Sequence, residues 1–187
     1  MEQSGANRIE EYYEVLAHHH SRSPNIEKAI DYLELANLKA IKANATADAQ
    51  IHFETALALY SKLPDTLENR RRRIATLLQQ VPVYLLQLEL TRYEQLLAAH
   101  ESVAASVEDE GLLGRFYGCI GHAHWFMGRH DEGLECSRKA VALCEKAREM
   151  GGAAFAYTLC CVLSPSRRAP ASELGVLLRL HGRVLTV

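Results

Sequence analysis

The residues that could do chemistry are densest in the stretch GHAHWFMGRHDEG, from Gly121 to Gly133. Five side chains within eleven positions carry imidazole or carboxylate groups: His122, His124, His130, Asp131 and Glu132. Imidazoles and carboxylates are common metal ligands and proton carriers in proteins. The stretch therefore raises two alternatives, a metal or acid–base site and a helical hairpin that is rich in histidine.

A helical assignment separates these side chains. Residues two apart on a helix differ by about 200° of rotation, so His122 and His124 point to opposite faces. His124 continues an apolar stripe with helical spacing, formed by Leu113, Phe116, Tyr117, Ile120 and Gly121. We therefore expect His124 to be a packed, hydrogen-bonded core histidine. We expect His130 to pack against the preceding helix, and Asp131 and Glu132 to stabilise the positive end of the next helix.

Three other groups of reactive residues give no specific signal. The triplet His18-His19-His20 has no pair spaced four apart, and we expect a solvated helix end there. The five cysteines are odd in number, form no C-x-x-C pair and lie in apolar stretches, which is typical of a reduced protein. The run from Arg70 to Arg73 could recognise an acidic partner segment, but we expect it to be a solvated helix surface. No metal or other cofactor is predicted.

Composition narrows the class of protein. The 187 residues are 48% hydrophobic and 24% charged, with a formal net charge of -2, which does not favour nucleic-acid binding. The N-terminus lacks an apolar signal segment, and no run approaches the ~18 apolar residues of a membrane span. We expect a cytoplasmic protein that does not bind membranes. No Ser or Cys lies in a recognisable nucleophile setting, so no enzyme activity is predicted.

Helical periodicity covers every long segment and predicts an all-α fold of about eight helices. The first helix is expected from Ile9 to His20. The second begins with Ser23 as its N-cap and Pro24 at its first position, and runs to about Ala43. Thr46 can cap a third helix that runs to Ser61. A longer pattern over 66–89 should be kinked or split by Pro82, and four more helices are expected over 90–106, 111–128, 130–149 and 152–163.

Internal repeats are present but irregular. The second helix of each pair carries a triplet spaced 0, +4, +7, with small residues favoured at its ends: Ala29, Leu33 and Ala36; Ala49, Phe53 and Ala56; Leu96, His100 and Val103; Gly133, Ser137 and Ala140. Tyr117, Ile120 and Gly121 precede the last triplet, and Gly128 lies in the turn between. This frame resembles the tetratricopeptide (TPR) repeat of about 34 residues. The resemblance implies a stack of antiparallel helix hairpins, an α-α superhelix, although the four triplets begin 20, 47 and 37 residues apart.

A narrower resemblance covers roughly residues 10–163. Residues 61–162 resemble the C-terminal helical-repeat region of bacterial signalling proteins that carry an adenylate or guanylate cyclase domain and an AAA/STAND-type ATPase. Residues 18–65 are similar to the helical segment that follows the ATPase. The chain has no phosphate-binding loop and no paired metal-binding aspartates, so the resemblance implies a repeat module without either activity. We expect a repeat domain over 1–163 and a divergent tail over 164–187, forming a short capping helix or a truncated end.

The TPR resemblance also implies a binding surface. The places that commonly line a TPR groove are held by Arg115, Gly118, His122, Trp125 and Phe126. Trp125, the sole tryptophan, would anchor a peptide or a partner helix. We therefore predict a non-enzymatic interaction module that binds a protein or peptide partner or self-associates. The alternative is a histidine-based sensor of a metal or small ligand, for which zinc binding lost on substitution of His122 or His130 would be evidence.

Overall fold

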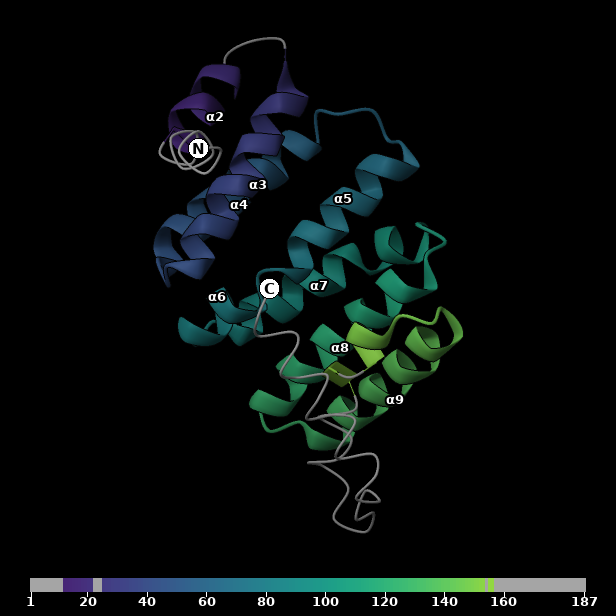
Figure 1. Ribbon diagram of the computed structural model, residues 1–187. Helices are drawn as coiled ribbons and strands as arrows, with labels where there is room; N and C mark the ends of the chain where they lie inside the picture. Colours follow the sequence, from purple (N-terminus) through teal and green to yellow (C-terminus); the bar gives the residue numbers. More distant parts are fainter. Residues whose placement is uncertain (1–11, 22–24, 154, 157–187) are drawn as a thin grey trace, which may run out of the picture. The chain divides into compact units, whose positions relative to one another are not determined.

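The computed structural model describes residues 12–21, 25–153 and 155–156, and every regular element in these ranges is an α-helix (Figure 1). The predicted all-α class is confirmed. The chain divides into two compact units, Met1–Leu88 and Glu89–Val187, so a boundary lies inside the predicted 1–163 repeat domain. The predicted tail over 164–187 lies outside the described residues.

The first unit contains five described helices: α2 (Tyr13–Ser21), α3 (Ile26–Lys42), α4 (Thr46–Tyr60), α5 (Leu67–Leu78) and α6 (Val81–Leu86). α2 packs on α3 and α3 packs on α4, as Figure 1 shows for the purple and blue segments. Small residues at the contacts, including Ala29, Ala49 and Ala56, are fully buried and let these helices approach closely. The first two predicted triplets, which begin at Ala29 and Ala49, are buried throughout and are confirmed as contact residues.

Two helix starts differ from prediction. α3 begins at Ile26, and Asn25 caps it by accepting a hydrogen bond from the Lys28 amide at 3.3 Å. Thr46 does not cap α4; it is the first helical residue, and Ala45 precedes it without a side-chain hydrogen bond. The predicted break at Pro82 is confirmed, because α5 ends at Leu78 and Pro82 lies in the first turn of α6, where a missing N–H breaks no helical bond.

Buried polar contacts fasten α4 and the turn between α5 and α6 to α3. The Asn37 side chain donates to the Ala49 carbonyl at 2.7 Å, and Gln80 donates to the Asn37 side-chain oxygen at 3.0 Å. Both amides are fully buried. Because an unpaired buried amide would be strongly destabilising, this pair fixes the register of α3 against the end of α5.

Arg72 is not the solvated residue that the arginine run predicts. Its guanidinium reaches α3 and pairs with Asp31 at 2.7 Å and Glu34 at 2.8 Å. Glu34 also accepts hydrogen bonds from Thr76, at 2.7 Å, and from the Tyr60 hydroxyl. Burial and the Glu34 carboxylate raise the pKa of Tyr60 well above its usual range. The network holds three helices together through one carboxylate.

The second unit contains α7 (Leu90–Ala105), α8 (Glu110–Phe126) and α9 (His130–Lys146), and the backbone is helical again from Met150. α8 and α9 lie side by side along their length (Figure 1). In α9 the predicted triplet Gly133, Ser137 and Ala140 is fully buried. In α7 the predicted triplet of Leu96, His100 and Val103 is correct only at His100. Leu96 and Val103 are half-buried, and the buried residues are Tyr93, Leu97, His100 and Ala104.

The turns of this unit recur at a fixed interval. Glu108, Gly128 and Arg148 all have a left-handed backbone, with φ of 55°, 79° and 57°, and are spaced 20 residues apart. At two of these turns the next amide bonds a carbonyl five residues back, Arg129 to His124 at 2.9 Å and Glu149 to Cys144 at 2.8 Å. This bond closes a Schellman-type helix end. One hairpin therefore spans about 40 residues, longer than the ~34 of a TPR hairpin.

A substitution at Gly114 would test the close packing of α8 on α9. A Cβ there would overlap the Cys144 sulfur and lie 3.0 Å from both the Ala140 carbonyl oxygen and the Cys144 amide nitrogen. We expect Gly114→Ala to lower the free energy of unfolding by about 1–3 kcal/mol, although alanine favours helices. The measurement is urea unfolding followed by circular dichroism. Gly151→Ala, in an exposed helical turn, is the control and should not destabilise; equal stability of the two variants would contradict this packing.

Candidate interaction site at the end of α8

The end of α8 is defined by local sequence. Asp109 caps the start of the helix by accepting a hydrogen bond from the Leu112 amide at 2.9 Å. Gly128 ends it, because its φ of 79° is readily adopted by glycine and reverses the chain after one turn. The turn places Trp125 and Phe126 at the end of α8 directly beside His130, the first residue of α9.

Five rings gather there and form what we call the aromatic cluster: Phe155, His122, Phe126, Trp125 and His130. His122 stacks on Phe155 with ring centroids 3.8 Å apart and an interplanar angle of 10°. Trp125 meets Phe126 edge to face at 4.6 Å, and His130 lies 6.4 Å from Trp125. Phe126 is 45% exposed and His130 is also exposed, so the cluster presents apolar ring surface to solvent.

The structure brings together three of the four predicted site residues. His122, Trp125 and Phe126 belong to the cluster, with His122 and Phe126 6.3 Å apart. Arg115 lies two turns earlier on α8, is exposed, and has its aliphatic stem against Gly152. Gly118 and His122 do not face an open groove, because the Phe155 ring lies against both.

Phe155 was missed by the sequence reasoning. A helix was expected over 152–163, but nothing in that expectation placed one of its side chains against α8. The recurring 20-residue interval between turns could have predicted this contact. Helices two intervals apart occupy equivalent positions in successive hairpins. The helical turn that begins at Met150 is thus the counterpart of α8 in the next hairpin, and its Phe155 meets His122.

A charged network lies around the turn that joins α8 to α9. His124 is only 9% exposed, and its Nε2 lies 2.9 Å from a carboxylate oxygen of Glu94 on α7, which confirms the predicted core histidine. Arg129 pairs with the same carboxylate at 2.5 Å and with Glu132 at 3.5 Å. Burial raises the pKa of Glu94, but the hydrogen bonds from Arg129 and His124 outweigh it and hold that pKa below its usual value. The network ties α7, the turn and α9 to one another.

The residues at the start of α9 and two cysteines complete the description of this region. Asp131 and Glu132 lie in the first turn of α9, where carboxylates complement the helix dipole. His130 contacts Trp125 of the preceding helix, as expected. Cys119 and Cys144 are buried, and burial raises their thiol pKa values to about 12 and about 11. Both thiols are therefore protonated near neutral pH and act as apolar packing groups.

The histidine triplet is not simply a solvated helix end. His20 is half-buried, and its ring stacks on Tyr32 of α3 at 5.6 Å with an interplanar angle of 15°. In the described part of the chain no group of three or more His, Cys, Asp or Glu side chains is arranged to hold a metal ion. None of the helices described is both long and apolar enough to cross a membrane.

The stack of His122 on Phe155 makes stability depend on pH. Burial lowers the pKa of His122 from 6.5 to about 4, and the Gly118 carbonyl offsets only part of this shift. As the pH falls below 6.5, His122 takes up a proton in the unfolded chain before it does so in the folded chain. The stability contributed by neutral His122 is therefore present above pH 6.5 and lost as the pH falls toward 4. We expect His122→Phe to reduce the loss of stability over this range, measured by urea unfolding at a series of pH values.

His130→Phe is the matched control, since it removes an exposed imidazole of the same cluster and leaves the stack of His122 on Phe155 in place. This variant should keep the pH dependence of the natural sequence. An unchanged pH dependence in His122→Phe would contradict a role of burial at His122.

Comparison with models of protein families, with curated proteins and with solved structures gives no match for this chain. The resemblance to TPR proteins and to the bacterial signalling proteins therefore stays a prediction.

Proposed function

We propose that this chain is a non-enzymatic helical interaction module that binds a partner protein through the aromatic cluster. The observation that carries the proposal is an exposed Phe126 packed edge to face on Trp125, at the end of a helix whose backbone is locked against its neighbour. Aromatic side chains with this combination of exposure and rigid support are the usual energetic centres of protein interfaces.

The chemistry around the cluster supports the proposal. Arg129 and Glu132 lie at its edge, half-buried and exposed respectively, and supply charged groups beside the apolar rings. An apolar centre with a polar rim is the ordinary composition of a protein-binding patch. Since Glu94 and the turn at Gly128 already order these side chains, binding would cost little additional conformational entropy.

The repeat organisation supports the same class of function. Helical hairpins that succeed one another at a fixed interval build extended surfaces rather than closed pockets, and such arrays serve mainly in protein binding. The TPR-like frame seen in the sequence is part of this proposal, with a hairpin about six residues longer than the usual repeat. The free thiols of Cys119, Cys136 and Cys144 suit a cytoplasmic setting.

Phe126→Ala tests the proposal most cleanly, because the side chain is exposed enough for its removal to leave the fold intact. We expect its loss to weaken partner binding by roughly 2 kcal/mol or more, as for other aromatic centres of interfaces. The purified chain is immobilised to recover partners from an extract of its own cells. The affinity of a recovered, purified partner is then measured by calorimetry, and light scattering of the chain alone detects self-association as the second form of binding.

Ile51→Ala is the matched control. Ile51 lies on α4, in the other unit, and is 60% exposed. Its replacement by alanine therefore removes a similar apolar surface outside the cluster. Binding or self-association should be unchanged in this variant. Equal effects of the two substitutions, or none from Phe126→Ala, would exclude the aromatic cluster as the binding surface.

A further inference from the structure

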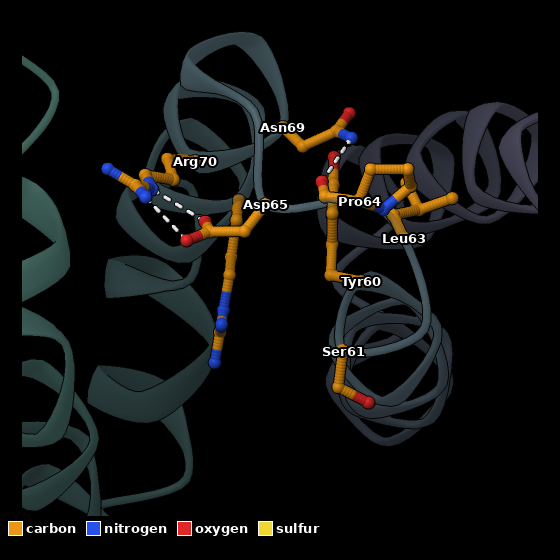
Figure 2. A pocket seen from close by; sticks show the side chains of 8 residues that line it. Tyr60, Ser61, Leu63, Pro64, Asp65, Asn69 and Arg70 are labelled. Atoms are coloured by element: carbon orange, nitrogen blue, oxygen red, sulfur yellow. Dashed lines mark hydrogen bonds and ion pairs between the residues drawn. The ribbon is translucent and has the colours of Figure 1, made fainter.

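A separate cavity of about 160 Å³ lies in the first unit, between the end of α4 and the start of α5. Its lining combines apolar and charged side chains, chiefly Tyr60, Leu63, Pro64, Asp65, Arg70 and Arg73. Figure 2 shows Arg70 and Asp65 on one side of the cavity and Tyr60, Leu63 and Pro64 on the other. Nothing in the proposed function uses this cavity.

Helix geometry sorts the four consecutive arginines. Arg70 and Arg73 are three residues apart, lie on the same face of α5 and line the cavity. Arg72 points to α3, where Asp31 and Glu34 hold it. Arg71 is exposed and outside the cavity lining. Two arginines of the run thus line one small cavity, and among the described residues of its lining Asp65 carries the carboxylate.

That carboxylate belongs to Asp65, which Arg70 holds through both of its oxygens; the Arg70 Nε lies 2.6 Å from one of them (Figure 2). The Asp65 side chain is 74% exposed, whereas that of Arg70 is only 33% exposed. The Arg70 side chain is therefore the more fixed of the two, and the Asp65 side chain is the one that can rotate into solvent. The pair lies at the surface, where water and salt screen it, so another carboxylate can compete with Asp65 for Arg70.

We propose that this cavity binds one carboxylate group, which takes the place of Asp65 on Arg70. The fork of a guanidinium matches the two oxygens of a carboxylate, and Arg73 adds a second positive charge to the same cavity. The volume is close to the ~150 Å³ that admits a single benzene ring, so it suits one glutamate-sized group rather than a larger ligand. Leu63 and Pro64 would contact the methylene groups of such a side chain.

The carboxylate can come from a small free acid or from a glutamate of a peptide, and three probes separate these sources. N-acetylglutamic acid amide carries the single carboxylate, and N-acetylglutamine amide is its neutral counterpart of the same shape. The peptide N-acetyl-Gly-Glu-Gly-amide adds a backbone on each side. Each is titrated into the full chain, with binding followed by the NMR shift of the Arg70 Nε resonance.

We expect saturable binding of the acid and not of the amide. Arg70→Gln should weaken binding about tenfold or more, because it removes a charged hydrogen-bonding partner, and Arg73→Gln should weaken it less. Where Arg70 is replaced, the amide resonances of Asn69 and Leu63 report binding. Tighter binding of the peptide assigns the site to a protein ligand, and equal binding assigns it to a free acid; both outcomes support a carboxylate site.

Two further variants make the test decisive. Arg71→Gln removes the same charge outside the cavity and should leave binding unchanged. Asp65→Asn removes the competing carboxylate and should tighten binding by up to about fivefold, which is the worth of an exposed ion pair. The proposal is overturned if the amide binds as well as the acid, if Arg71→Gln weakens binding as much as Arg70→Gln, or if Asp65→Asn fails to tighten it.

Discussion

The close approach of α8 and α9 is the constraint on which the second unit depends. Gly121 and Gly133 face each other across the contact, and a Cβ at Gly133 would lie 3.0 Å from the Gly121 carbonyl oxygen. Ser137 completes the contact and donates its hydroxyl to the Gly133 carbonyl within its own helix, at 2.8 Å. A larger residue at either position would force its neighbours to shift, so the two glycines allow the helices to pack at this short distance. The aromatic residues at the end of α8 are consequently held in one position against the start of α9.

Local sequence signals predicted the helices well, because the causes of a helix lie within a few residues. The apolar spacing around Phe116 and Tyr117 located α8, and Pro82 marked the division between α5 and α6. The core position of His124 also followed from spacing alone. Helix starts were less certain, since Asn25 and Ser23 are both good caps and the choice between them depends on how the turn is packed.

Partners distant in the chain could not be predicted. Glu94 lies 30 residues before His124, and Asp31 lies 41 residues before Arg72. A helical pattern shows which face of a helix is apolar but does not say which charged residue of another helix will meet it. The arginine run illustrates this limit, because four identical residues have different environments. The ion pairs of Arg72 with Asp31 and Glu34 distinguish it from the exposed Arg71.

The two candidate sites differ in whether binding requires an existing ion pair of the site to be broken. In the aromatic cluster the charged groups beside the rings are paired with one another, and binding would only have to cover the exposed surface of Phe126. In the cavity of the first unit, Arg70 is satisfied by Asp65, and a ligand has to replace that bond. Replacement makes the affinity for an anion modest but makes recognition selective, because a neutral group of the same shape would leave Arg70 without a charged partner. The first site would thus recognise a ligand mainly by the apolar area that it covers, and the second mainly by the charge that the ligand carries.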